Sequence, residues 1–367
     1  MHYQDLIDLE DPLIPPVDEA SDAVYRASKL DFITSTNKQQ PEEELSQEIE
    51  ENHDESDKPK TTNWSLLRVI ASAHTGWVRS LTVDPVTNKW FVTGGSDSLI
   101  KVWDLADSSL KATITGHIMA VRTTTVSSRF PYLFSGSEDR TVRCFDLERS
   151  NSPQGCEIRK YHGHVGSIFT MSLHPELDIL VTGGSDAAAR VWDIRSRVEV
   201  MTLVGHKNDI TSIITSETEP QIITSSMDNT IRLWDIRKQS TALTITQHSK
   251  SIRAMIEHPK ESTFTSSDSS GYIKQWLTTG DLLNEFKSPG IINTLAINHT
   301  NDNLFSGHHD GKFEIFDYKS GRSLQQSQTI PSPGSDQSSI YCSSFDLSGL
   351  RLFTGESDHS IKIWGQL

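Results

Sequence analysis

Residues 91–104 read FVTGGSDSLIKVWD, and this stretch recurs in altered form along most of the 367-residue chain. It consists of an apolar run, a Gly-Gly-Ser-Asp turn and a second apolar run that closes on an aromatic residue, a pattern typical of two short strands. The closing aromatic residues are spaced 40–48 residues apart: Trp103, Phe145, Trp192, Trp234, Trp276, Phe316 and Trp364. A repeat of this length predicts units that bury their faces only against one another.

Most units also place a histidine, a hydroxyl residue and an aspartate at fixed distances before the closing aromatic residue. The clearest sets are His74, Thr93, Asp97 and Trp103; His164, Thr182, Asp186 and Trp192; and His206, Thr224, Asp228 and Trp234. These residue types could form a catalytic triad, but an enzyme needs only one such site. Recurrence from unit to unit indicates a structural hydrogen-bond network, which stabilises the fold only if every member is paired.

The repeats resemble the WD40 family from Trp64 to the end of the chain. The resemblance implies an all-β fold, a seven-bladed β-propeller with one four-stranded sheet per repeat. Unit 2 closes on Phe145 and therefore lacks the indole donor. Unit 5 has Ser270 where the aspartate is expected, with Asp268 two residues early, and units 6 and 7 lack the Gly-His dipeptide. We therefore expect blades 5–7 to depend more on packing.

The two ends of the repeat region predict how the ring closes. The sequence finishes with SIKIWGQL, directly after the third strand of the last unit, whereas WSLLRVI at 64–70 precedes the first unit. We expect residues 64–70 to form the outer strand of the seventh blade, because that pairing covers an exposed sheet edge. The chain then divides into a segment at 1–60 and a propeller at 61–367.

The net charge of −15 is concentrated at the start of the chain. Residues 1–60 contain 17 acidic and 5 basic residues, against 32 and 29 in the remainder. Repulsion between like charges predicts that segment 1–60 is mostly disordered, or ordered only when a partner binds its apolar positions. The propeller is nearly neutral, so the acidic total does not exclude a place beside RNA.

Other patterns bear on compartment and chemistry. The chain begins without a signal-peptide pattern and has no apolar run long enough for a membrane span. Its three cysteines form no CxxC pair, which argues against structural zinc. No phosphate-binding loop, HExxH or nucleophile-elbow motif is present. We expect no enzymatic activity, cofactor, metal or small-molecule substrate, and no membrane partner.

In WD40 blades, the residues three and five positions after the histidine, and the residue before the turn aspartate, lie near the narrow top rim. The resemblance thus implies a partner-binding surface of Trp77, Arg79, Arg122, Phe169, Met227, Arg253 and Tyr341, with Thr211 and Asn293 at equivalent positions. Exposed Trp, Tyr and Arg are typical of binding hot spots. An acidic helix or peptide is the expected ligand, RNA phosphate is an alternative, and packing of the arginines over neighbouring blades is the structural alternative.

Several phrases narrow the resemblance further: SSRFPYLFSGSEDRTVRCFDLE at 127–148, LHPELDILVTGG at 173–184, EPQIIT at 219–224 and IKQW at 273–276. They resemble the pleiotropic-regulator subfamily of WD40 proteins. This implies a nuclear, non-enzymatic scaffold of the spliceosomal nineteen complex, which supports pre-mRNA splicing through protein contacts. The implied partners are splicing-complex proteins, including a Myb-like splicing factor, with spliceosomal RNA nearby and within reach of direct contact.

A second class of function stays open from the sequence. Trp192–Arg195 and Trp234–Arg237 fit the WDxR pattern of propellers that act as substrate receptors of cullin ubiquitin ligases. In that case Arg195 and Arg237 would bind an adaptor carboxylate at the bottom rim. An ordinary ion pair with a nearby carboxylate is the structural alternative.

Overall fold

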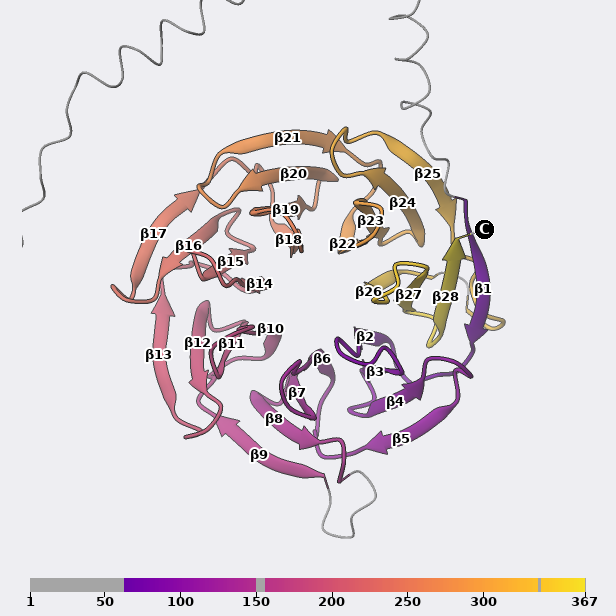
Figure 1. Cartoon of the computed structure of the whole chain (residues 1–367), viewed down its shortest axis with the longest axis horizontal. Helices are drawn as coiled ribbons and strands as arrows, with labels where there is room; N and C mark the ends of the chain where they lie inside the picture. The colour runs from indigo at the N-terminus through magenta and orange to yellow at the C-terminus, as the bar shows by residue number, and fades with distance from the viewer. Residues whose placement is uncertain (1–62, 150–155, 336–337, 367) are drawn as a thin grey trace, which may run out of the picture. The chain divides into compact units, whose positions relative to one another are not determined.

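The computed structural model describes residues 63–149, 156–335 and 338–366, which form a closed ring of seven blades (Figure 1). Each blade is a four-stranded sheet whose neighbouring strands are antiparallel. The seven-bladed β-propeller expected from the repeats is therefore confirmed. The described residues contain no helix, and so none that could cross a membrane.

The chain crosses each blade from the centre of the ring outward. The innermost strands are β2 (Val78–Val83), β6 (Val121–Val126), β10 (Ile168–Leu173), β14 (Ile210–Thr215), β18 (Ile252–Glu257), β22 (Ile292–Ile297) and β26 (Ile340–Phe345). The second strands are β3 (Trp90–Gly95), β7 (Tyr132–Ser137), β11 (Ile179–Gly184), β15 (Ile222–Ser226), β19 (Thr263–Asp268), β23 (Asn303–His308) and β27 (Arg351–Glu356). The second strands are buried almost throughout, because neighbouring blades cover both faces of each sheet.

The outer half of each blade is more exposed. The third strands are β4 (Ile100–Asp104), β8 (Thr141–Asp146), β12 (Ala188–Asp193), β16 (Ile231–Asp235), β20 (Tyr272–Leu277), β24 (Lys312–Asp317) and β28 (Ile361–Gln366). The outer strands are β5 (Leu110–Ile114), β9 (Glu157–His162), β13 (Glu199–Val204), β17 (Ser240–Ile245), β21 (Leu282–Lys287), β25 (Ser323–Gln328) and β1 (Trp64–Ile70). Most outer strands have few buried residues, as expected for the rim of the ring.

Strand β1 joins the two ends of the repeat region. It pairs antiparallel with β28, with Trp64 opposite Gln366 and Ile70 opposite Ile361. In Figure 1 the two strands lie side by side although they are nearly 300 residues apart in sequence. The sheet order β1-β28-β27-β26 makes residues 64–70 the outer strand of the seventh blade. The acidic segment 1–60 lies outside the described residues, so its disorder and its boundary stay predictions.

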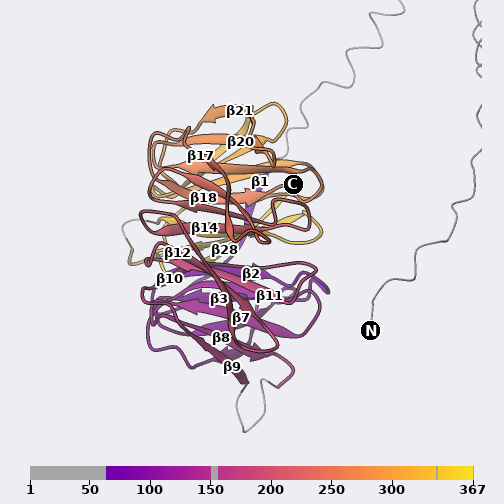
Figure 2. The same ribbon diagram turned by 90° about the vertical axis from the view of Figure 1, so that its left-hand side faces the viewer.

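The core is divided among the seams between blades. Figure 2 views the ring from the side, where adjacent sheets lie face to face. Each seam contains one cluster of buried residues drawn from both neighbours; between blades 7 and 1, for example, Phe91 packs against Phe353 with ring centroids 4.9 Å apart. Each sheet thus completes its core against the next, which is why the repeat must close into a ring.

Candidate partner-binding surface

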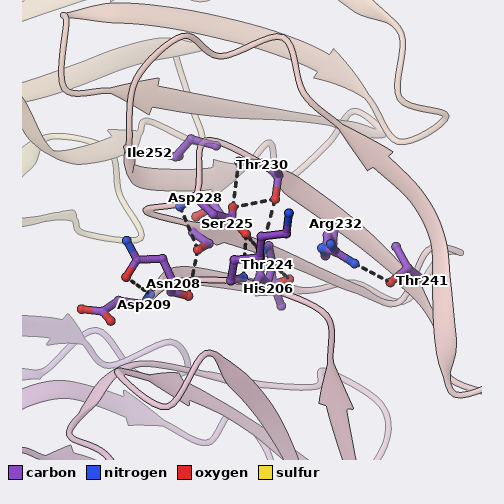
Figure 3. A network of polar contacts seen from close by, with 12 residues as sticks. His206, Asn208, Asp209, Thr224, Ser225, Asp228, Thr230, Arg232, Thr241 and Ile252 are labelled. Atoms are coloured by element: carbon purple, nitrogen blue, oxygen red, sulfur yellow. Dashed lines mark hydrogen bonds and ion pairs between the residues drawn. The ribbon is translucent and has the colours of Figure 1, made fainter.

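In blades 1, 3 and 4 the repeated polar residues form a hydrogen-bond chain; Figure 3 shows His206, Thr224 and Asp228 of the blade 4 chain. His206 bonds Asp228 through Nδ1 (3.0 Å) and Thr224 through Nε2 (2.8 Å), and the Trp234 indole donates to the same threonine oxygen (2.8 Å). Blades 1 and 3 repeat these contacts in His74–Asp97 (3.0 Å), His74–Thr93 (2.9 Å), Trp103–Thr93 (2.9 Å), His164–Asp186 (2.7 Å), His164–Thr182 (2.7 Å) and Trp192–Thr182 (2.8 Å).

The electrostatics of these chains suit a structural role. Burial disfavours ionisation of Asp97, but the hydrogen bond and charge of His74, together with the backbone N–H groups of Leu99 and Thr75, lower the pKa of Asp97 to about 2. The threonine hydroxyls are fully buried and already engaged by histidine and tryptophan. The network connects the loop before each innermost strand to the turn between the second and third strands. It therefore holds the loops that build one face of the ring.

The expectation that blade 5 relies on packing is wrong. Asp268, although two residues early, bonds His248 at 3.4 Å, and His248 bonds Ser266 at 2.7 Å. The Trp276 indole donates to Ser266 at 2.8 Å, which completes the chain. Asp268 can do this because it ends β19 and also accepts the backbone N–H of Ser270, so its side chain points back over the turn.

Blades 6 and 7 have other buried polar groups in place of the missing histidine, and their greater dependence on packing stays a prediction. In blade 6, Ser288 bonds His308 at 3.0 Å and donates to Glu314 at 2.6 Å. In blade 7, the ammonium of Lys362 contacts Glu356 at 2.5 Å and Asp358 at 3.5 Å. Lys362 and Glu356 are almost completely buried.

The buried His308 predicts a loss of stability in mild acid. Burial lowers the pKa of His308 to about 4, so the folded protein keeps it neutral while the unfolded chain protonates it near pH 6.5. The stability that neutral His308 contributes is fully present above about pH 6.5 and is lost as the pH falls toward 4. The loss in the free energy of unfolding is about 2 kcal/mol at pH 5. Urea unfolding at pH 7.5 and 5.0 should show a smaller pH effect for His308→Asn than for the wild type. Equal pH effects in both proteins would contradict this assignment.

The centre of the top face is built by seven β-bulges. We call the top face the end of the ring formed by the loops before the innermost strands and the turns between the second and third strands. In the first hairpin of every blade, the pairing register skips one residue near the start of the innermost strand. The skipped residues are Arg79, Arg122, Phe169, Thr211, Arg253, Asn293 and Tyr341. A bulge leaves its extra residue unpaired and redirects its side chain.

These seven side chains, together with Met227, line one depression of about 210 Å³, which we call the top-face depression. It contains six of the seven residues predicted for the partner-binding surface. The seventh, Trp77, does not line the depression but stacks beside it on Tyr341, with ring centroids 5.7 Å apart. Thr211 and Asn293 complete the lining. The repeat position predicted where Thr211 and Asn293 lie, but their small polar side chains did not indicate a binding role.

The arginines of the depression differ in how they are held. The Arg79 guanidinium lies over the rings of Trp77 (4.6 Å) and Tyr341 (4.7 Å). Arg122 lies over Phe169 at 4.6 Å and pairs with Glu138 at 3.4 Å. Both arginines therefore bridge neighbouring blades, as the structural alternative expected, and both are lining residues of the depression.

Positive charge in the depression is only partly compensated. Burial lowers the pKa of Arg122, and the charge of Arg79 lowers it further, so the two guanidinium groups repel each other. Arg253 is exposed, and neither it nor Arg79 has an ion pair with any carboxylate in the described ranges. The depression can therefore accept an anionic group.

The two WDxR arginines lie away from this surface, in the loops that follow the third strands β12 and β16. Arg195 pairs with Asp178 at 2.6 Å, and Arg237 pairs with Glu219 at 3.5 Å. Their side chains are 74% and 87% exposed. Each arginine thus has a carboxylate partner on another loop, although Asp178 also pairs with Arg129 at 3.1 Å.

Comparison with known proteins places the chain in a family. The WD domain, G-beta repeat family matches residues 64–104, 108–146, 155–193, 197–235 and 325–365. Over 99% of its length, the chain is 57% identical to the pre-mRNA-splicing factor PRP46 of Debaryomyces hansenii, covering 94% of that protein. The chain belongs to the PRP46 family of WD40-repeat proteins. The PRP46 of Candida albicans is 54% identical over 97% of the chain and 96% of the relative. The PRP46 of Saccharomyces cerevisiae is 45% identical over 83% of the chain and 66% of the relative.

Membership of the PRP46 family confirms the WD40 resemblance and its narrowing to proteins named for pre-mRNA splicing. The repeat family leaves residues 236–324 unmatched. That stretch contains most of blades 5 and 6, where the repeated residues deviate in sequence but a polar network is still present.

Proposed function

We propose that this chain is a non-enzymatic scaffold that supports pre-mRNA splicing in the nucleus by binding other splicing proteins. One observation carries the proposal: relatives that are 57% and 54% identical to almost the whole chain are named pre-mRNA-splicing factors. The repeated His, hydroxyl and Asp residues favour a scaffold over an enzyme, because their polar atoms are engaged within each blade.

The top-face depression is the proposed binding surface for the main protein partner. Its arginines and aromatic rings are the residue types found at binding hot spots, and its arginines would attract negative charge. A Myb-like splicing factor and other proteins of the nineteen complex are the proposed partners, with spliceosomal RNA nearby. A protein ligand would present an acidic helix or extended segment to this face.

Affinity purification of the tagged full-length chain, from cells that express it, tests the proposed function. We expect splicing proteins and spliceosomal small nuclear RNAs to be recovered together. Recovery of a cullin and its adaptor without these RNAs would contradict the proposal.

Charge reversal in the top-face depression should weaken partner capture without unfolding the ring. In Arg79→Glu/Arg253→Glu, two cations that attract an acidic partner become repulsive, and we expect recovery of splicing proteins to fall about tenfold or more. Arg237→Glu, a charge reversal at an exposed residue on a different loop, is the control. Circular dichroism melting would verify folding, and unchanged recovery by a folded double variant would place the interface elsewhere.

The ubiquitin-ligase alternative receives no support from the relatives' names, and both WDxR arginines pair locally. We therefore expect Arg195→Ala/Arg237→Ala to recover splicing proteins as the wild type does. Ion pairs this exposed contribute little to stability, so the double variant should also fold normally. Loss of the splicing proteins in this variant would show that the bottom rim, and not the top face, binds them.

A further inference from the structure

The charge balance of the top-face depression indicates what kind of anion it takes. Three arginines line it, and the one ion pair that any of them forms within the described residues joins Arg122 to Glu138. Two positive charges therefore remain. A carboxylate would neutralise one of these, whereas a phosphate monoester carries about −1.5 to −2 charges at pH 7 and would match both.

We propose that the top-face depression binds a phosphorylated serine or threonine of a partner protein. This inference rests on the proposed function and deepens it, because it names the group that the partner presents and makes binding dependent on phosphorylation. Planar guanidinium groups suit phosphate, since each can donate two parallel hydrogen bonds to its oxygens.

The other lining residues fit a phosphorylated segment of protein. Thr211 donates to the Ile252 carbonyl at 2.9 Å, and Asn293 donates to the Ile340 carbonyl at 3.0 Å. These two side chains are thus fixed against the next blade, and the arginines are left as the donors for an anion. Met227 adds an apolar wall that suits a side chain next to the phosphorylated residue.

The surroundings of the depression favour a protein ligand over RNA. RNA that binds without base recognition needs a track of cations along several phosphates, usually with aromatic rings free to stack on bases. On the neighbouring loops and turns, basic residues alternate with acidic ones, since Asp209 follows Lys207 by two residues and Arg140 follows Glu138 and Asp139. The rings of Trp77 and Tyr341 stack on each other, and the Arg79 guanidinium lies over both.

Binding of defined probes to the full-length chain tests the inference. The probes are degenerate peptide libraries with a fixed central phosphoserine or phosphothreonine, matched libraries with Ser, Thr or Glu at that position, and a single-stranded oligouridine. We expect the phosphorylated libraries to bind about tenfold more tightly than the Glu libraries. Arg253→Lys should lose most of that preference because it keeps charge but not bidentate geometry, whereas Arg237→Lys should retain it.

The outcomes separate this inference from the proposed function. Equal binding of Glu and phosphorylated libraries, binding of oligouridine alone, or no binding of any probe would overturn the phosphate assignment. In cell extract, phosphatase treatment should abolish capture of the partner that depends on Arg253. If that capture survives the treatment, the inference is wrong and the scaffold function stands. If untreated extract yields no splicing proteins at all, the proposed function is wrong instead.

Discussion

Removing residues 1–70 should prevent cooperative folding, whereas removing residues 1–60 should leave the unfolding transition of the propeller almost unchanged. The longer deletion takes away β1 and exposes the whole edge of β28. It also removes Trp64, which is 3% exposed and packs edge-on against Phe345 at 5.5 Å. The backbone N–H and carbonyl of Trp64 bond the Gln325 side chain at 2.7 and 2.8 Å, so the strand also fastens blade 6 to blade 7.

Thermal and urea unfolding of the two truncations would check this expectation. A point variant separates loss of the strand from loss of its core contact: Trp64→Ala should cost about 3–5 kcal/mol. Val69→Ala, in the same strand but 41% exposed, is the matched control and should cost less than about 1 kcal/mol. Equal melting temperatures for the 1–60 and 1–70 deletions would show that β1 does not close the ring.

Replacing Lys362 by methionine should destabilise the protein by about 3–5 kcal/mol, because Glu356 would be left buried without its cation. The double variant Lys362→Met/Glu356→Gln should recover much of this loss, since the pair is then replaced by neutral groups. Asp358 stays satisfied in both, because it accepts bonds from the Ser360 and Ser332 backbones. Urea unfolding of the three proteins at one pH measures the difference.

The pH dependence of the single variant gives a second check. Burial already raises the pKa of Glu356, and loss of Lys362 removes a charge that opposes this rise. A carboxyl with a raised folded pKa favours the folded state most below the unfolded pKa and loses that contribution as pH rises. The deficit of Lys362→Met relative to the wild type should therefore be smaller at pH 5 than at pH 8. A pH-independent deficit, or a double variant no more stable than the single one, would contradict the account of blade 7.

The fold could be predicted from the sequence because every blade repeats the same local pattern. Seven closing aromatic residues at near-constant spacing fix the number of sheets, and each sheet can bury its faces only against the next. The blade networks were predictable where the spacing is strict. The networks of blades 5 and 7 were not predicted, because their residues depart from the repeat spacing. Asp268 contacts His248 from an unexpected position, and Lys362 with Glu356 takes the place of a histidine.

The residues of the candidate site could be predicted from their positions in the repeat, but the reason why they converge could not. Counting five residues from each histidine selects Arg79, Arg122 and Arg253, yet the sequence does not show why these side chains converge. The structure supplies the reason, since each sits at a bulge that redirects it to the centre of the top face. Trp77 lies outside the depression and stacks on Tyr341, a contact that links blades 1 and 7 and has no signature in either repeat alone.

The most direct measurement of the central claim is splicing itself in cells that depend on this chain. Candida albicans cells in which PRP46 is repressed would be supplied with the wild-type chain, with Arg79→Glu/Arg253→Glu, or with Arg237→Glu, and the ratio of unspliced to spliced transcripts would be measured. We predict a low ratio with the wild type and with Arg237→Glu, and a strong rise with the top-face variant at equal protein level. A top-face variant that supports splicing as well as the wild type would contradict the claim that this surface holds the splicing partner.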